Sequence, residues 1–189
     1  TKVPYTTALN GANNAITVLG GNTATKLLWP ENSIPLVMTM CSVSRYTGTA
    51  FYRILNSYYA PSQSMNFLHG HWDGKRGKAH YTVWKTTASP SVGVLTNWLV
   101  MCGTSGVATP DNIIIDQLGI GTSSVTSHVV GRLHINYHEA SNFEVHSLYV
   151  WNAVLTPVQM RQTTSALRAQ IGGQPDIANN EVGPAVEPM

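Results

Sequence analysis

Short hydrophobic runs recur along the chain, and glycine, asparagine and aspartate residues separate many of them. In residues 129–137, Leu133, Ile135 and Tyr137 alternate with polar residues, which is the pattern of a half-buried β-strand. Other runs are apolar on both faces, as in strands at the middle of a sandwich. The pattern predicts strands at residues 15–19, 35–43, 51–55, 66–72, 79–84, 97–102, 112–115, 118–120, 129–137 and 143–151.

One helix is predicted after the last of these strands. Thr156 is a good N-cap, Pro157 suits the first helical position, and Gln159 completes a capping box. Gly172 ends the helix. Its short apolar stripe, which predicts packing against a sheet edge, consists of Met160, Thr164, Leu167 and Ile171.

The composition excludes several classes of protein. With 189 residues, 43% of them hydrophobic, the chain is long enough and apolar enough to fold around one core. It has no run of about 18 apolar residues, so no membrane insertion is expected. The net charge is +2, and residues 1–173, with 11 basic and 6 acidic residues, carry +5, which is less than duplex DNA binding usually shows. A secreted protein is not expected to meet single-stranded nucleic acid, so no nucleic-acid partner is expected.

The content of charged residues is 11%, against about 25% in an average soluble protein. This favours a secreted or cell-surface β-sandwich. We expect one all-β domain at residues 1–173. Residues 174–189 hold three prolines and no periodic pattern, so they are predicted to form a tail or linker.

The last strand and the helix carry a family resemblance. Residues 145–160, VHSLYVWNAVLTPVQM, resemble the closing motif of laminin-G-like and pentraxin-like domains in the concanavalin A-like lectin/glucanase superfamily. Residues 112–116 resemble the hairpin strand of that family, with Gln117 in place of its glycine. The resemblance covers roughly residues 10–172. It implies a two-sheet antiparallel jelly-roll sandwich with one short C-terminal helix.

The resemblance also bears on Cys41 and Cys102, the two cysteines of the chain. By themselves they allow either one bridge or two buried thiols. In pentraxins a disulfide joins two strands that match those carrying Cys41 and Cys102. The resemblance therefore implies a disulfide between neighbouring core strands.

A hairpin around residues 73–77 combines cationic and aromatic residues. Sulfate and carboxylate groups pair with Lys and Arg, and sugar rings stack on aromatic faces. Related laminin-G modules bind glycans, so the resemblance implies carbohydrate as the partner, with an anionic glycan as one form of it. The alternative is a solvated hairpin whose aromatic residues belong to the core. The predicted ligand-binding residues are His71, Trp72, Lys75, Arg76 and Tyr81.

Two patterns point to metal ions. Modules that the chain resembles bind Ca²⁺ through oxygen ligands on loops, and the matching stretch offers Glu139 and Asn142 as weak calcium candidates. His69, His71 and Asp73 alternate as zinc ligands on a strand would, although no fourth ligand is evident. The alternatives are a solvated loop and histidines that line a polar sheet face.

Glycosidases of this superfamily carry a Glu-x-Asp-x-Glu strand, which supplies the paired carboxylates of the reaction. The chain lacks that motif, and its nearest acidic pair is Glu139 and Glu144. We therefore predict a non-enzymatic extracellular recognition module that binds carbohydrate or an extracellular protein. The alternatives are a structural subunit that self-associates in an extracellular filament, coat or cell-surface protein, and a glycoside hydrolase or lyase.

Overall fold

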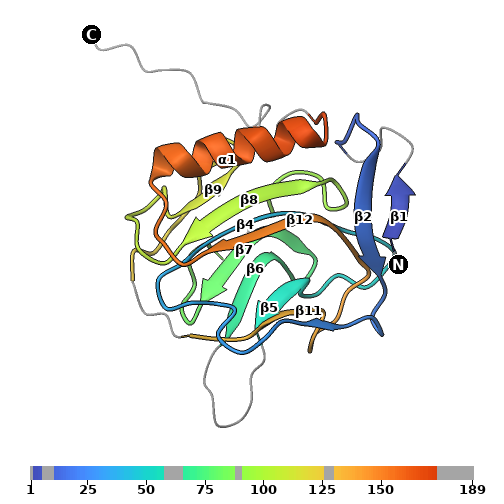
Figure 1. The fold of residues 1–189 in the computed structure, drawn as a ribbon, viewed down its shortest axis with the longest axis horizontal. Coiled ribbons are helices and arrows are strands. Elements are labelled where there is room, and N and C mark those ends of the chain that lie inside the picture. Colours follow the sequence, from blue (N-terminus) through green and yellow to red (C-terminus); the bar gives the residue numbers. More distant parts are fainter. Residues whose placement is uncertain (1, 6–10, 58–65, 88–90, 126–129, 174–189) are drawn as a thin grey trace.

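Two antiparallel β-sheets and one α-helix form three layers in the computed structural model (Figure 1). It describes residues 2–5, 11–57, 66–87, 91–125 and 130–173. The helix covers one face of the larger sheet, and the smaller sheet covers the other face. The predicted all-β sandwich with one short C-terminal helix is confirmed, whereas the predicted tail at residues 174–189 lies outside the described residues.

The larger sheet has seven strands and the smaller sheet has five. In spatial order, the larger sheet contains β1 (Lys2–Tyr5), β2 (Ile16–Gly21), β12 (Phe143–Trp151), β4 (Thr39–Tyr46), β8 (Leu99–Thr104), β9 (Ile113–Ile115) and β10 (Leu118–Gly119). The smaller sheet contains β3 (Leu27–Leu28), β11 (Leu133–Ile135), β5 (Leu55–Ser57), β6 (Phe67–Trp72) and β7 (Lys75–Tyr81). Helix α1 (Pro157–Gln170) follows β12 in the chain.

Some strands begin later than their hydrophobic runs. The apolar run from residue 35 was expected to be extended throughout, but β4 begins at Thr39, where its pairing with Thr104 of β8 starts. Likewise β5 begins at Leu55, which pairs with β11 and β6. A strand requires a backbone partner as well as an apolar sequence, so the available neighbours set these boundaries.

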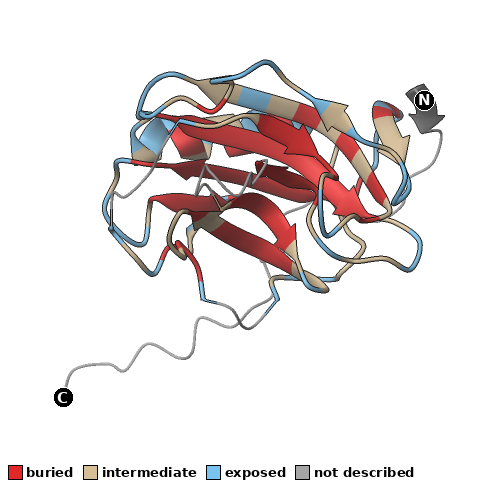
Figure 2. Ribbon diagram, turned by 90° about the horizontal axis from the view of Figure 1, so that it is seen from below, coloured by how far each residue is buried: buried red, intermediate tan, exposed pale blue. Residues whose placement is uncertain are grey.

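The apolar core lies between the two sheets, and a second apolar layer lies beneath the helix. Alternation along β4 and β8 sends Met40 and Met101 into the intersheet core, while Val43 and Val100 face the helix. Both strands are buried along their whole length, as the central strands in Figure 2 show. The layer beneath the helix also contains Met160, Leu167 and Ile171.

A disulfide joins the two central strands β4 and β8. Cys41 and Cys102 are direct partners in the ladder, with their Cα atoms 4.1 Å apart. The bridge that the resemblance implied is therefore confirmed. It lies on the helix side of the sheet, in the apolar layer beneath α1.

The N-terminus of helix α1 is capped as predicted. The side chain of Thr156 accepts a hydrogen bond from the backbone N–H of Gln159, and Gln159 Oε1 accepts one from the backbone N–H of Thr156, which confirms the capping box.

A buried ion pair ties the helix to the sheet. Arg168 binds both carboxylate oxygens of Asp116, at 2.7 and 2.8 Å, and the pair is almost fully buried. The helix therefore lies across β8, β9 and β4, rather than against a sheet edge as predicted.

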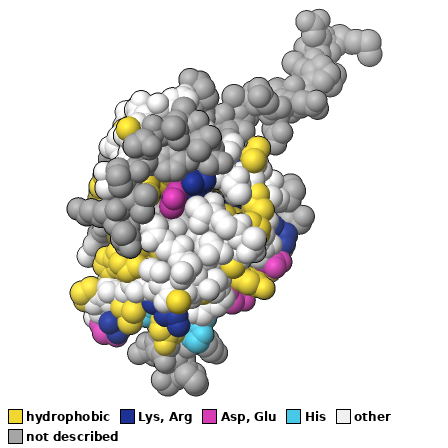
Figure 3. Space-filling view, turned by 90° about the vertical axis from the view of Figure 1, so that its right-hand side faces the viewer, with side chains coloured by type: hydrophobic (Ala, Val, Ile, Leu, Met, Phe, Trp, Pro, Cys, Tyr) yellow, Lys and Arg dark blue, Asp and Glu magenta, His cyan; other side chains and the backbone are white. Residues whose placement is uncertain are grey.

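Charged residues make up 11% of the chain. Charged side chains are sparse on the face shown in Figure 3, and uncharged polar groups and backbone cover much of it. In the described part of the chain, no helix combines the length and the apolar character that crossing a bilayer demands.

We predict that replacing Cys41 and Cys102 together by alanine lowers the free energy of unfolding by about 4 kcal/mol. Without the bridge, the unfolded chain is no longer closed into a long loop, so its conformational entropy is higher. Urea denaturation of oxidised protein and double variant measures the difference. Reductant should destabilise the wild type and leave the double variant unchanged. Equal urea midpoints for the oxidised wild type and the variant would contradict the prediction.

Candidate functional site

The β6–β7 hairpin turns several predicted ligand residues into the interior. Alternation along β6 points His69 and His71 toward the larger sheet, and both side chains are fully buried. His69 shares a hydrogen bond of 2.6 Å with the hydroxyl of Tyr81, and Tyr81 stacks on Phe67. His71 Nδ1 lies 3.5 Å from Ser44 Oγ of β4. The contact between His71 and Ser44 therefore joins the two sheets.

Arg76 is also inside, because β7 contains a β-bulge. Two residues of β7 occupy the space of one on β6 between the Gly70–Lys78 and His71–Arg76 pairs, and the extra residue is Gly77, with a φ of 73°. The bulge turns Arg76 to the same side as His71. Its guanidinium donates hydrogen bonds to three main-chain carbonyls, those of Val92 (3.1 Å), Val94 (2.6 Å) and Trp98 (3.1 Å).

Of the five predicted ligand residues, Trp72 and Lys75 remain at the surface, while His71, Arg76 and Tyr81 are fully buried. Lys75 Nζ binds Asp73 Oδ2 at 2.9 Å and lies 5.4 Å from the centre of the Trp72 ring. Trp72 in turn packs against Trp84, with ring centroids 5.0 Å apart. The surface of the hairpin is thus an aromatic pair beside an ion pair.

The other two cations of this region also have partners within the chain. Lys78 donates to the carbonyl of Thr87 at 2.7 Å, and Lys85 donates to the carbonyl of Val125. Main-chain carbonyls of the protein therefore already bind the ammonium groups of Lys78 and Lys85. These two lysines therefore do not support an anionic ligand at the hairpin.

The predicted metal ligands are engaged in protein contacts. Glu139 forms an ion pair with Arg53, and Asn142 Oδ1 accepts hydrogen bonds from the amides of Thr49 and Ala50. The zinc alternative is contradicted, because His69 and His71 are fully buried whereas the carboxylate of Asp73 lies in the exposed turn. Within the described ranges, no three His, Cys, Asp or Glu side chains gather as a metal site.

Burial controls the charge of the interior histidines. It lowers the pKa of His69 to about 4, and it lowers the pKa of His71 well below the usual value, with further lowering by Arg76 and His69. Both rings are therefore neutral at pH 7. As neutral groups, His69 bonds Tyr81 within the hairpin and His71 lies beside Ser44 of β4.

We predict that acid destabilises the fold through these histidines. An unfolded histidine takes up a proton near pH 6.5, whereas folded His69 resists protonation down to about pH 4, so stability is full above pH 6.5 and falls as the pH drops toward 4. The loss for His69 alone is roughly 3 kcal/mol. Urea midpoints between pH 7.5 and 4.5 measure it.

The His69→Gln variant should show a smaller loss over the same pH range than the wild type. Identical pH profiles for His69→Gln and wild type would contradict the assignment.

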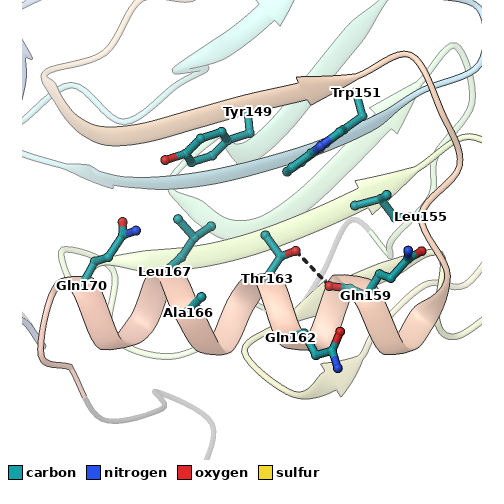
Figure 4. A pocket seen from close by; sticks show the side chains of 9 residues that line it. All are labelled: Tyr149, Trp151, Leu155, Gln159, Gln162, Thr163, Ala166, Leu167 and Gln170. Carbon is teal, nitrogen blue, oxygen red and sulfur yellow. Dashed lines mark hydrogen bonds between the residues drawn. The ribbon is translucent and has the colours of Figure 1, made fainter.

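A groove of about 480 Å³ lies between β12 and α1, on the helix side of the larger sheet (Figure 4). Tyr149 and Trp151 are two residues apart on β12, so both side chains project from the same face. Their rings are nearly parallel, at 24°, with centroids 5.8 Å apart, and Tyr149 is 44% exposed. The residues that line the groove are Tyr149, Trp151, Leu155, Gln159, Gln162, Thr163, Ala166, Leu167 and Gln170.

The helix supplies the opposite wall. Gln159, Thr163, Ala166 and Gln170 follow one another at helical spacing, so they share the face of α1 that looks toward β12 (Figure 4). The short side chains of Thr163 and Ala166 leave room in the middle, and a glutamine amide stands at each end. Thr163 Oγ1 donates to the Gln159 carbonyl at 2.8 Å, which fixes its rotamer. The arrangement offers flat rings on one side and amides on the other.

Sequence reasoning missed this groove. It assigned Trp151 to a closing-strand motif and α1 to packing alone, and the groove requires both elements side by side. The available signal was Tyr149 and Trp151 at alternate positions of one strand, followed by a helix with three glutamines on its polar side.

Comparison with known proteins supports the fold but assigns the chain to no family. No family model matches the chain, and no curated protein matches it. The laminin-G and pentraxin resemblance therefore holds at the level of a two-sheet antiparallel sandwich.

Two solved structures are similar at low identity. A structure of Trypanosoma rangeli sialidase in complex with the inhibitor DANA has a TM-score of 0.51 and 13% identity, over 82% of this chain and 28% of that chain. A mutant of Trypanosoma rangeli sialidase displaying trans-sialidase activity has a TM-score of 0.53 and 13% identity, over 92% of this chain and 30% of that chain. The chain thus spans under a third of their length, and the likeness shows the fold alone.

The prediction that the chain is not an enzyme is corrected by these structures. Both are structures of sialidases, which are enzymes. That prediction rested partly on the resemblance of the chain to non-enzymatic recognition modules. Because structures of enzymes contain the same fold, the fold gives no ground for excluding enzymatic activity.

Proposed function

We propose that the chain is a carbohydrate-binding β-sandwich domain and that its ligand lies in the groove between β12 and α1. The observation that carries the proposal is the pair of nearly parallel rings of Tyr149 and Trp151 in a concave site. Aromatic rings present a flat apolar face to the C–H side of a sugar, and the polar atoms at their edges stay solvated. On the opposite wall, Gln162 and Gln170 supply both donors and acceptors for sugar hydroxyls. Gln159, whose Oε1 is held in the capping box, supplies its Nε2 donors.

Three observations support an extracellular setting within a larger protein. The Cys41–Cys102 disulfide is of the kind that persists in oxidising compartments. The content of charged residues is low, at 11%. The chain matches under a third of the sialidase structures that share its fold, so we propose that it serves as one domain of a longer carbohydrate-active protein.

The hairpin surface is proposed as a second, weaker contact. Trp72 and Trp84 present an aromatic pair on the outside of the smaller sheet, and Lys75 and Asp73 stand beside it as an ion pair. Since α1 and the smaller sheet cover opposite faces of the larger sheet, this contact faces away from the groove. A long glycan or a second glycan chain would be required to reach it.

We predict that Tyr149→Ala weakens glycan binding about tenfold, which corresponds to about 1.4 kcal/mol, because it removes half of the stacking surface. A glycan array run with calcium and again with chelator first identifies the ligand and shows whether metal is needed. Isothermal titration calorimetry with that ligand then measures the change in Kd.

The matched control is Tyr52→Ala. Tyr52 is similarly exposed, at 49%, and lies outside the groove, so this variant should bind as the wild type does. An array with no bound glycan, or a Tyr149→Ala variant with unchanged affinity, would refute the proposed site.

A further inference from the structure

The groove is lined entirely by uncharged side chains. Its polar lining residues are three glutamines, one threonine and one tyrosine, together with the indole of Trp151. The two arginines of α1 point elsewhere: Arg161 binds Asp111 at 2.6 Å, and Arg168 binds Asp116 at 2.7 Å. The charges closest to the groove along the helix are therefore already paired with carboxylates on the other side of α1.

This lining determines which sugars the groove accepts. An acidic sugar brings a carboxylate or sulfate, and removing such a group from water is costly unless a cation or several strong donors replace the water. The lining of the groove offers no cation. A neutral sugar brings hydroxyl groups, each of which donates and accepts, and an amide side chain matches both functions.

The length of the groove favours more than one sugar ring. Gln159 and Gln170 stand at its two ends, and eleven residues of helix span roughly 16 Å at 1.5 Å per residue. Tyr149 and Trp151 lie one after the other along the opposite wall (Figure 4). Two neighbouring sugar rings are needed to cover both aromatic faces.

We infer that the groove selects an uncharged oligosaccharide and discriminates against acidic sugars such as sialic acid. This inference rests on the proposed function, because it specifies the ligand class of the same groove. It places the selectivity in the glutamine and aromatic lining, with Ala166 as the small residue that keeps the middle open.

Ala166 also gives a steric test that removes no ligand contact. It is exposed on α1, and leucine is a good helix former, so Ala166→Leu should fold normally while its side chain fills the groove. Ala169→Leu makes the same change at an exposed position of the same helix that lies outside the groove lining.

The experiment compares matched pairs of immobilised oligosaccharides, each in a neutral form and in a form extended by sialic acid. The neutral form should bind at least tenfold more tightly, Ala166→Leu should abolish binding, and Ala169→Leu should retain it. A Gln170→Arg variant, which adds a cation at one end of the groove, should recover binding of the sialylated form at least tenfold.

The outcomes separate the two proposals. Sialylated forms that bind as well as neutral ones, with binding lost in Ala166→Leu, overturn the selectivity and leave the groove as the binding site. Binding that survives Ala166→Leu overturns the groove as the site. An array with no bound glycan of either kind overturns the proposed function itself.

Discussion

The pairing of β4 with β8, tied by the Cys41–Cys102 disulfide, is the interaction on which the rest of the structure depends. On one side of this pair, β4 forms an eight-residue ladder with β12 and so fixes Tyr149 and Trp151. On the other side, β8 pairs with β9, and the turn after β9 carries Asp116, which binds Arg168 of α1. The β4–β8 pair therefore positions both walls of the groove, β12 on one side and α1 on the other.

The local features of the fold could be predicted from the sequence. The capping box at Thr156 and the alternation in residues 143–151 depend on neighbours in the chain, so the helix and β12 were predicted with nearly their observed bounds. The pairing of Cys41 with Cys102 came from the family resemblance, because spacing by itself allowed free thiols as well. These predictions succeeded where the deciding contacts are local or follow a shared pattern.

The site could not be predicted in the same way. Whether Arg76 meets solvent depends on one extra residue, Gly77, in the ladder with β6, and a simple period of two places Arg76 on the wrong side. The groove depends on how α1 crosses the sheet, which the buried Arg168–Asp116 pair decides across more than fifty residues of sequence. A contact between residues so far apart in sequence produces no periodic pattern from which it could be predicted.

The position of β12 has a consequence for how the protein is made. This strand lies between β2 and β4, although β2 ends about 120 residues before it and β4 about 100 residues before it. Until residues 143–151 leave the ribosome, β2 and β4 have no neighbour to pair with along those edges, and unpaired strand edges promote aggregation. Completion of the larger sheet is thus a late event in synthesis, and a chain that stops before β12 exposes the unpaired edges of β2 and β4 instead of a finished sandwich.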